Sequence, residues 1–296
     1  MNVPLVSFIT VCFNGYHDTC ELIDSLCTYV TSVSYEIIVV DNASEQDEAA
    51  RLHDKYGNRI VTIRSEKNLG FAGGNNLGIQ ASKGQYLFFI NNDTYVTDDK
   101  LNVLVNMLYE HPSTGGLSPK LRFTIPPYNI QYAGFTPLTP ITLRNETIGY
   151  GKPDDGTYNT PIPTPYLHGA AMLVKREVID KVGMMPEQFF LYYEELDWCT
   201  HITKAGYELW YTPQWTVFHK ESQSTGTESP MKIYYMTRNR LLYAWRNLPT
   251  TQKWLSVLYQ CTIPVWRNML LYILQGKYSL LNAMFKGIGS FFLRRC

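Results

Sequence analysis

The run Asn91-Asn92-Asp93 directly follows Tyr86–Ile90, an apolar segment with the composition of a buried β-strand. A carboxylate at the end of a strand can hold a divalent cation. Mg²⁺ takes one or two carboxylates from a protein and leaves its other positions to phosphate and water. His219 follows another strand-like segment and is a candidate second ligand with Asp93. On this run alone a plain turn is the better interpretation, because Asn and Asp are common turn residues.

Three carboxylates fall within four residues, at Glu194, Glu195 and Asp197, and aromatic side chains surround them. Apolar surroundings raise the pKa of a carboxyl group and make it a better proton acceptor at neutral pH. If a helix begins near Glu194, then Glu194 and Asp197 share one face of it. Acidic residues also favour a helix N-terminus, but that preference does not explain the aromatic cluster. The segment is therefore a candidate for general-base chemistry.

Two further segments have the residue types of a nucleotide site. Asp41, in the turn Asp41-Asn42-Ala43-Ser44, could accept the imide N–H of a uracil or thymine ring, although an Asx turn or helix cap is likelier in isolation. The small residues between Asn68 and Asn76 permit close approach of a ligand, and the helix after them offers its N-terminus to a phosphate. Their spacing fits neither the dinucleotide GxGxxG pattern nor the P-loop GxxxxGK[ST] pattern.

These residues need a scaffold that brings them together. The first 110 residues alternate strand-like and helical segments, which predicts an α/β fold with a doubly wound, mostly parallel sheet. Ligands of such sheets lie beyond the carboxyl ends of the strands, and Asn14, Asp41 and Asn91-Asn92-Asp93 all fall at such ends. Residues 113–165 show no helical period, and we expect irregular β-structure and loop there. Residues 166–220 return to regular elements, including a strand expected at residues 208–211.

The charge is divided unevenly along the chain. The 296 residues carry 26 basic and 26 acidic side chains, but residues 229–296 hold ten basic and no acidic ones. With 45% hydrophobic and 18% charged residues, the chain is globular, and disordered or collagen-like classes are excluded. We expect a catalytic domain over residues 1–229 and a basic, apolar helical extension over residues 230–296.

The extension has no run of about 20 apolar residues, so a membrane-spanning helix is not expected. Amphipathic helices at an anionic membrane surface fit the pattern better. A helical hairpin packed on the domain, or on a second subunit in a homo-oligomer, is the alternative. The basic residues are interleaved with apolar runs, which argues against nucleic acid as a partner. Six cysteines without a CxxC pair indicate reduced thiols in the cytoplasm, and the N-terminus lacks the features of a signal peptide.

Taken together, residues 4–248 resemble the inverting, GT-A-fold glycosyltransferases of family 2, and most of all its rhamnosyltransferase-like bacterial group. The resemblance is carried by several ordered segments: VSFITVCFN, EIIVVDNAS, NLGFAGGNNLGI, LFFINND, HGAAMLVKREVIDKVG, FFLYYEELDWCTHITKAGY, VFHKESQS and YYMTRNRLLY. It implies a single displacement at the anomeric carbon of a nucleoside diphosphate sugar, dTDP-rhamnose or a UDP-sugar. The acceptor would be a hydroxyl of a glycan or lipid-linked molecule in cell-surface polysaccharide synthesis, at the cytoplasmic face of the membrane.

The resemblance also implies roles for individual residues. Glu195 matches the general base, while Asp93 and His219 match ligands of Mg²⁺ or Mn²⁺, although this metal motif has only one carboxylate. The donor would contact Thr10, Asn14, Asp41, Asn68, Asn75, Asn92, Arg238 and Asn239. The acceptor side would include His168, Glu194, Asp197 and Trp198. A nucleotidyltransferase, or a membrane-bound nucleotide-sugar-binding module without turnover, remains the alternative.

Overall fold

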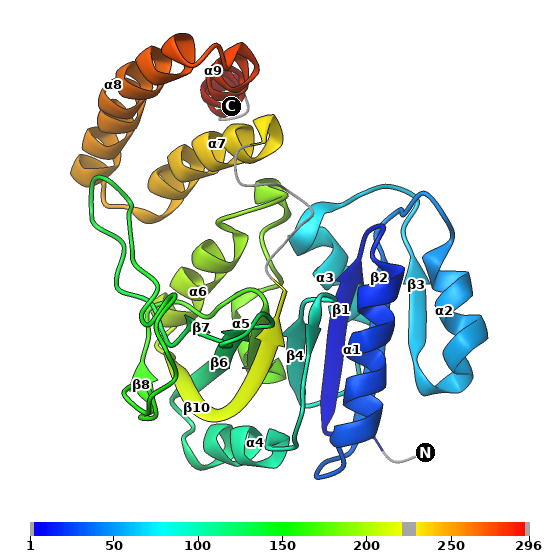
Figure 1. Ribbon diagram of the computed structural model, residues 1–296. Coiled ribbons are helices and arrows are strands. Elements are labelled where there is room, and N and C mark those ends of the chain that lie inside the picture. The colour runs from blue at the N-terminus through cyan, green and yellow to red at the C-terminus, as the bar shows by residue number, and fades with distance from the viewer. Residues whose placement is uncertain (1–2, 221–228, 294–296) are drawn as a thin grey trace.

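The computed structural model describes residues 3–220 and 229–293. It shows an α/β body with helices on both faces of one sheet, and a lobe of three C-terminal helices at one end of that body (Figure 1). The predicted α/β class and the helical extension are therefore confirmed.

The sheet has the order β3-β2-β1-β4-β9-β6-β10-β5. Its first four strands are parallel, whereas β9 runs antiparallel to both β4 and β6, and β10 is parallel to β6. The sheet is thus mixed, and the parallel arrangement expected for most of it holds for β3-β2-β1-β4. The strands are β1 (Val6–Cys12), β2 (Tyr35–Asp41), β3 (Val61–Arg64), β4 (Tyr86–Ile90), β5 (Thr94–Tyr95), β6 (Thr114–Phe123), β7 (Ile130–Tyr132), β8 (Ile162–Pro163), β9 (Ala171–Lys175) and β10 (Glu208–His219).

Strand β6 is a ten-residue central strand, in a stretch where the sequence predicts irregular structure. Its glycines, Pro119 and Lys120 conceal the apolar pattern, yet most of the strand is buried. Proline lacks a donor for the sheet, and its neighbour β10 has a register shift between Thr212 and Thr216, opposite Pro119 and Lys120. Strand β10 also continues past this irregularity to His219, instead of ending at residue 211.

Helices cover both faces of the sheet because side chains along each buried strand alternate in direction. Phe8 and Phe88 pack with α1, α2 and α4 on one face, while Ile9 and Phe89 pack with α3, α5 and α6 on the other. This is the doubly wound arrangement that the alternating pattern predicts. The helices of the body are α1 (Tyr16–Tyr29), α2 (Glu48–Tyr56), α3 (Gly70–Ala81), α4 (Leu101–Glu110), α5 (Arg176–Val182) and α6 (Glu194–Lys204), with short 3₁₀ turns η1 (Gly57–Arg59) and η2 (Glu187–Phe189).

The helical lobe consists of α7 (Pro230–Asn247), α8 (Thr250–Leu274) and α9 (Tyr278–Leu293). Helix α7 lies against α6 and η2 of the body and carries α8 and α9 on its other sides (Figure 1). Ser256 and Gln260 of α8 also donate hydrogen bonds to the carbonyl groups of Ile141 and Thr142. Among the described residues, the helices all fall short of the length and hydropathy that a bilayer crossing needs.

Candidate active site

A cleft of about 670 Å³ opens beyond the carboxyl ends of β1 and β4 and beside the end of β10. This is the place at which ligands of parallel α/β sheets bind. Its lining includes main-chain and side-chain atoms of Val11, Phe13, Asn14, Gly15, Asp18, Asn92, Asp93 and Lys220.

Asp93 and His219 come together at the edge of this cleft, although 126 residues separate them in the sequence. The carboxylate oxygen Oδ1 of Asp93 lies 3.2 Å from Nε2 of His219. The other ring nitrogen, Nδ1, lies 2.8 Å from the amide oxygen of Gln131, and the Asn91 amide nitrogen lies 3.4 Å from Nε2. With its proton on Nδ1, the His219 ring donates to the Gln131 amide oxygen, and Nε2 accepts from the Asn91 amide nitrogen. The Nε2 lone pair then lies on the side of the ring that faces Asp93. An imidazole whose second nitrogen donates to a fixed oxygen is the usual arrangement of a metal-ligating histidine.

Asn14 and Asn92 shape the cleft. Asn14 has a positive φ of 55°, and its side-chain oxygen accepts the N–H of Glu45. The Asn92 amide donates to the Thr19 hydroxyl, and this hydrogen bond holds the segment Asn91-Asn92-Asp93 against the start of α1. A Cβ at Gly15 would lie 2.4 Å from the Asn92 amide nitrogen, so a larger residue there would displace the Asn92 side chain. The amide group of Asn92 is therefore used to hold the wall of the cleft.

Asp41 lies at the end of β2, but its side chain is fully buried. It accepts N–H groups of Ser44, Glu48 and Ala49, and it forms an ion pair with Arg64. These donors hold the carboxylate beneath the turn, so in this conformation the Asp41 side chain is not presented to the cleft. A base-reading role for Asp41 stays a prediction.

A buried group of Cys12, Asp41 and Glu48 has ligand atoms close enough to hold a metal ion. Its chemistry does not suit one. Glu48 already accepts the N–H groups of Gly15 and Tyr16, and burial together with the nearby carboxylates raises the pKa of the Cys12 thiol. A protonated thiol is a poor metal ligand. This polar cluster instead fixes the starts of α1 and α2.

Thr10, Asn68 and Asn75 differ in their surroundings, and their assignment as donor contacts stays a prediction. Thr10 is 1% exposed within β1, and its hydroxyl has no hydrogen-bond partner among the described residues. Asn68 accepts hydrogen bonds from the Gly70 N–H and the Asn42 amide, and the Asn75 amide donates to a carbonyl of its own helix.

The glycines of helix α3, which begins in the glycine-rich segment 68–76, are needed for packing against β1. Cβ atoms at Gly74 and Gly78 would lie 2.8 Å from Val11 and 2.3 Å from Ile9. Helix α3 therefore packs directly on β1, and these glycines admit strand side chains instead of a ligand. The expected approach of a ligand to the glycine-rich run stays a prediction.

The loop before α6 positions the acidic cluster through an unusual backbone. Phe190, Tyr192 and Tyr193 all have positive φ angles, of 65°, 68° and 74°, which non-glycine residues rarely adopt. Such conformations cost free energy and cluster at functional sites. Helix α6 begins immediately afterwards, at Glu194 and Glu195.

The two glutamates differ in environment. Glu194 is 3% exposed, and its Oε2 finds no hydrogen-bond partner among the described residues. Burial, and then the neighbouring Glu195 carboxylate, raise the pKa of Glu194 well above its ordinary value. Glu195 is partly exposed beside Gly169, and desolvation raises its pKa as well. Of the two, Glu195 is the carboxylate that a substrate can reach.

Arg238 and Asn239 of α7 hold this loop, and their assignment to the donor stays a prediction. The Asn239 amide nitrogen donates to the carbonyl groups of Phe189, Leu191 and Tyr192 at 2.7–2.8 Å. Arg238 donates through Nη2 to the carbonyl groups of Gln188 and Phe189. Both side chains are buried, so they position the loop that carries the glutamates.

Asp197 and Trp198 make structural contacts, and their assignment to the acceptor side stays a prediction. Asp197 is fully buried and accepts two hydrogen bonds from Arg246 and one from Asn247. Trp198 is 1% exposed and donates to the Gly183 carbonyl from within the core. Buried residues of this kind cannot contact an acceptor without rearrangement.

His168 remains close to the metal pair. Its ring stacks on Phe135, and its centroid lies 6.3 Å from that of His219. Nδ1 accepts the Ala170 N–H, so Nε2 carries the proton of the neutral ring. Burial, with a smaller contribution from His219, lowers the pKa of His168 to about 3. This neutral N–H donor lies on the same side of the sheet edge as Gly169 and Glu195.

Two residues of the site have no role assigned from the sequence. Gln131 lies in the stretch without a regular pattern, and nothing in the sequence marks it as the partner of His219. Lys220 directly follows His219, and this position next to a candidate metal ligand is the sequence feature that could have identified it. Its ammonium group contacts Asp18 and Glu21 at 2.5 Å, and its N–H donates to the Asp93 carbonyl. Lys220 thus brings an ammonium group to the mouth of the cleft, where it is paired with two carboxylates.

Comparisons with known proteins agree with this fold. The chain is 28% identical over 232 residues to the low-salt glycan biosynthesis hexosyltransferase Agl10 of Haloferax volcanii, which covers 75% of this chain and 71% of Agl10. It is 25% identical over 230 residues to the O-antigen biosynthesis protein RfbC of Myxococcus xanthus, but spans only 17% of that longer protein. A 66-residue segment, 22% of each chain, is 35% identical to an N-acetylglucosaminyl-diphospho-decaprenol L-rhamnosyltransferase of Mycobacterium tuberculosis.

Solved structures show the same architecture. GalNAc-T7, determined with UDP, GalNAc and Mn²⁺, superposes with a TM-score of 0.62 at 17% identity, over 82% of this chain and 51% of that one. The mannosyltransferase PcManGT of Pyrobaculum calidifontis, in complex with GDP-Man and Mn²⁺, gives 0.57 at 15% identity, over 99% and 76%. The predicted GT-A fold is confirmed. The sequence model of glycosyl transferase family 2 matches residues 7–183. The chain therefore belongs to glycosyl transferase family 2 and is a glycosyltransferase of glycan biosynthesis.

Proposed function

We propose that this enzyme transfers a sugar from a nucleoside diphosphate donor to an acceptor hydroxyl, with inversion at the anomeric carbon. The observation that carries the proposal is the Asp93–His219 pair, whose ring tautomer Gln131 fixes at the end of the parallel strands. One carboxylate oxygen and one imidazole nitrogen form a donor set that suits Mn²⁺ and leaves room for phosphate oxygens. The Mn²⁺ bound in GalNAc-T7 and PcManGT supports a divalent ion here, and Mg²⁺ is the alternative.

In this proposal Asp93 and His219 hold the ion, which when bound neutralises charge on the departing nucleoside diphosphate. Glu195 takes the proton from the acceptor hydroxyl. The hydroxyl oxygen then forms its bond to the anomeric carbon on the face opposite the departing phosphate oxygen, and the configuration inverts. The raised pKa of Glu195 makes it a stronger base than an exposed carboxylate.

The neighbouring Glu194 supports this role without taking part in the transfer. Burial and the neighbouring Glu195 carboxylate raise the pKa of Glu194, so the close pair disfavours two charged carboxylates at once. His168 and Lys220 contribute an N–H donor and a positive charge at the same cleft. His168 fits a hydroxyl of the sugar or the acceptor, and Lys220 fits the diphosphate.

We further propose dTDP-rhamnose or a UDP-sugar as donor and a lipid-linked glycan as acceptor, at the cytoplasmic face of a membrane. The segment shared with the diphospho-decaprenol rhamnosyltransferase supports both choices. The described parts of α8 and α9 expose many large apolar side chains. These include Trp254, Leu258, Trp266, Leu270, Leu274, Phe285 and Leu293. Together with the basic composition, this surface fits an anionic membrane interface.

The test is turnover with dTDP-rhamnose and UDP-sugars on a lipid-linked acceptor, with and without Mn²⁺, for the wild type and Glu195→Gln. We expect Glu195→Gln to keep donor affinity, measured by calorimetry, and to lose on the order of 10²–10⁴-fold in kcat. Glu177→Gln, an exposed glutamate of α5, is the matched control. Full activity of Glu195→Gln, or retention of configuration at the anomeric carbon by NMR, contradicts the proposal.

A further inference from the structure

The helical lobe contains a groove of about 240 Å³ between α7, α8 and α9. Two cationic side chains of α7, Lys232 and Arg240, line it. Most of the remaining lining is apolar, from Ile233, Met236, Pro264, Val265, Tyr272 and Met284. The groove therefore combines two positive charges with a surface suited to a hydrocarbon chain.

The charges of this groove lack a carboxylate partner. Residues 229–296 contain no acidic residue, and within residues 3–220 and 229–293 no ion pair joins Lys232 or Arg240 to an acid. The guanidinium group of Arg240 donates through Nε to the Tyr193 hydroxyl at 2.8 Å, which is a neutral partner. Within residues 3–220 and 229–293, an anion bound between the two cations would therefore not compete with a paired carboxylate.

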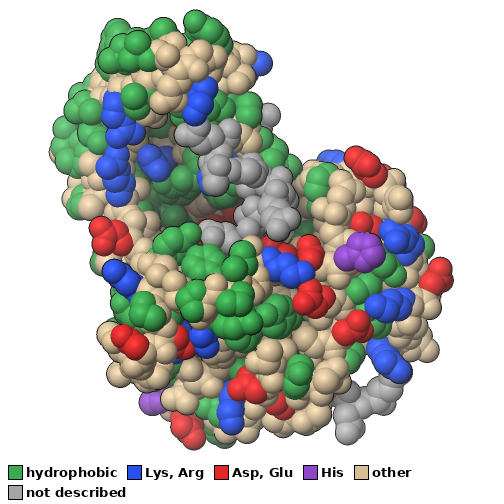
Figure 2. Space-filling model, viewed as in Figure 1, with side chains coloured by type: hydrophobic (Ala, Val, Ile, Leu, Met, Phe, Trp, Pro, Cys, Tyr) green, Lys and Arg blue, Asp and Glu red, His purple; other side chains and the backbone are tan. Residues whose placement is uncertain are grey.

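The hydrogen bond between Arg240 and Tyr193 connects the groove to the loop before α6, which carries the proposed base Glu195. Tyr193 is the residue before Glu194 and caps the start of α6. Figure 2 shows a hollow between the helical lobe and the α/β body, with Lys and Arg side chains on the wall that the lobe contributes. A ligand held at Arg240 is thus next to the segment that carries the proposed base.

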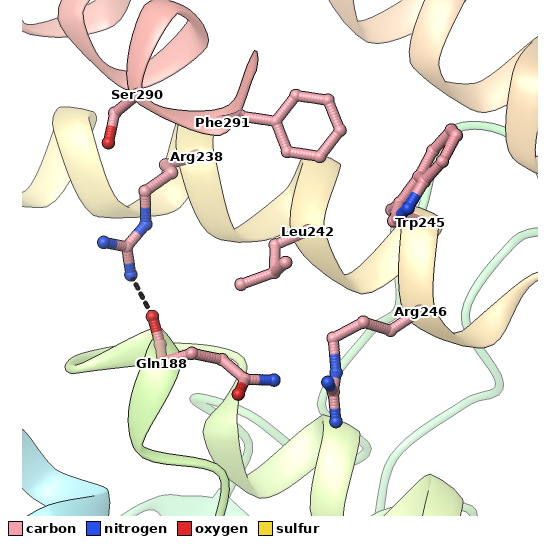
Figure 3. Close-up of a pocket in the computed structure, with 7 residues that line it drawn as sticks. All are labelled: Gln188, Arg238, Leu242, Trp245, Arg246, Ser290 and Phe291. Carbon is pink, nitrogen blue, oxygen red and sulfur yellow. Dashed lines mark hydrogen bonds between the residues drawn. The ribbon is translucent and has the colours of Figure 1, made fainter. Parts of the chain in front are cut away.

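A second cavity in the lobe, of about 410 Å³, is less suited to an anion (Figure 3). Its two guanidinium groups already have partners. Arg246 forms a bidentate pair with Asp197, and Arg238 donates to main-chain carbonyl groups of Gln188 and Phe189. The positive charge of this cavity is therefore used to hold the lobe on the body.

We propose that the groove between α7, α8 and α9 binds the diphosphate and the adjoining isoprenoid chain of the acceptor lipid. Lys232 and Arg240 contact the diphosphate, and Met236, Val265 and Tyr272 contact the chain. This assignment rests on the proposed function, since it gives the lipid-linked acceptor its place. It accounts for the two unpaired cations, the apolar lining and the connection to Tyr193.

The test is calorimetry of the full chain with farnesyl diphosphate as probe, in the presence of saturating UDP and Mn²⁺. Filling the donor site first prevents the diphosphate of the probe from binding there. Lys232→Ala and Arg240→Ala should each weaken farnesyl diphosphate by about tenfold or more. The wild type should bind farnesyl diphosphate more tightly than inorganic diphosphate. Val265→Trp should abolish this difference in affinity, because the larger side chain fills the apolar part of the groove. Lys286→Ala, an exposed basic residue of α9 outside the groove, should change neither affinity.

Two outcomes overturn the proposal: equal affinity for farnesyl diphosphate and inorganic diphosphate in the wild type, or unchanged affinity in both Lys232→Ala and Arg240→Ala. A third arm uses vesicles of anionic phospholipid. If Lys232→Ala weakens vesicle binding only as much as Lys286→Ala does, and farnesyl diphosphate affinity is unchanged, the charges serve the bulk membrane surface. UDP binding in Mn²⁺ is measured for every variant, so a failure of the donor site is seen separately from a failure of the groove.

Discussion

The α-carbon of Gly70 lies against the carbonyl oxygen of Phe190, so closely that a Cβ at Gly70 would be 2.1 Å from that oxygen. The next residue, Phe71, donates its N–H to the same oxygen at 2.8 Å. The start of α3 is thus fixed to the loop that carries the glutamates. The contact joins α3 to the loop that carries the proposed base Glu195, and a side chain at position 70 would clash with the Phe190 main chain.

We predict that Gly70→Ala displaces the catalytic loop and lowers both stability and turnover. Gly70 has a φ of 72°, which costs alanine roughly 1–2 kcal/mol, and the clash with Phe190 adds to that cost. Gly57→Ala is the matched control, because Gly57 also has a positive φ, of 56°, but has open space around it. Thermal unfolding and kcat are measured for both. Equal effects of the two substitutions would show that the contact with Phe190 is unimportant.

Gln131→Ala should weaken Mn²⁺ binding by on the order of 10–100-fold, because the His219 tautomer loses its fixed acceptor. Gln131→Glu keeps an oxygen at that position and should retain most of the affinity. Mn²⁺-dependent UDP binding, followed by calorimetry, provides the measurement, with the exposed Gln214→Ala as control. Wild-type affinity in Gln131→Ala would remove Gln131 from the metal site.

Asn239→Ala should lower kcat while leaving the affinity for the donor unchanged. The substitution leaves the carbonyl groups of Leu191 and Tyr192 without the Asn239 donor, at a cost of roughly 1–3 kcal/mol for a buried group, while Phe189 keeps its hydrogen bond from Arg238. Asn102→Ala, on the exposed side of α4, is the control. A variant that loses donor affinity and keeps kcat would return Asn239 to the donor site.

Asp93 and Asn239 illustrate which features of the site can be predicted from the sequence and which cannot. The strand and helix alternation, the position of Asp93 and the approach of His219 to it follow from residue order, since carboxyl ends of parallel strands meet at one edge. The roles of Asn239, Arg238 and Gly74 depend on which neighbour they contact. Hydrogen bonds to main-chain carbonyl groups and contacts with strand side chains leave no pattern in the sequence. Strand β6 was missed because burial there depends on neighbours on both sides and not on its own composition.

Glu194→Gln should stabilise the fold at neutral pH and have little effect in acid. The pKa of Glu194 is raised on folding, so its protonated form favours the native state, and that stability is lost as pH rises through the folded pKa. Glutamine imitates the protonated form at every pH. We expect a higher Tm for the variant near pH 8 and equal Tm values near pH 4, the acid side of an ordinary glutamate (roughly 4.3). A variant less stable than the wild type near pH 8 would show that the charged form is favoured.

Membrane binding should depend on the exposed apolar side chains of α8. Trp266 and Leu270 are 66% and 59% exposed and lie one helical turn apart. Burial of a large apolar side chain is worth about 1.5–3 kcal/mol, so Trp266→Ser with Leu270→Ser should reduce binding to anionic liposomes by at least about tenfold in co-sedimentation.

Tyr109→Ser, which changes an exposed aromatic residue of α4, is the control and should leave liposome binding unchanged. Point substitutions are preferred to truncation after Leu248, because α9 packs on α7 and its removal would expose the buried residue Leu241 of α7. Raising the salt concentration should weaken wild-type binding, since charges are screened within about 8–10 Å. If the double variant binds liposomes as the wild type does but changes from oligomer to monomer in sedimentation, this face is a subunit interface and the membrane proposal is wrong.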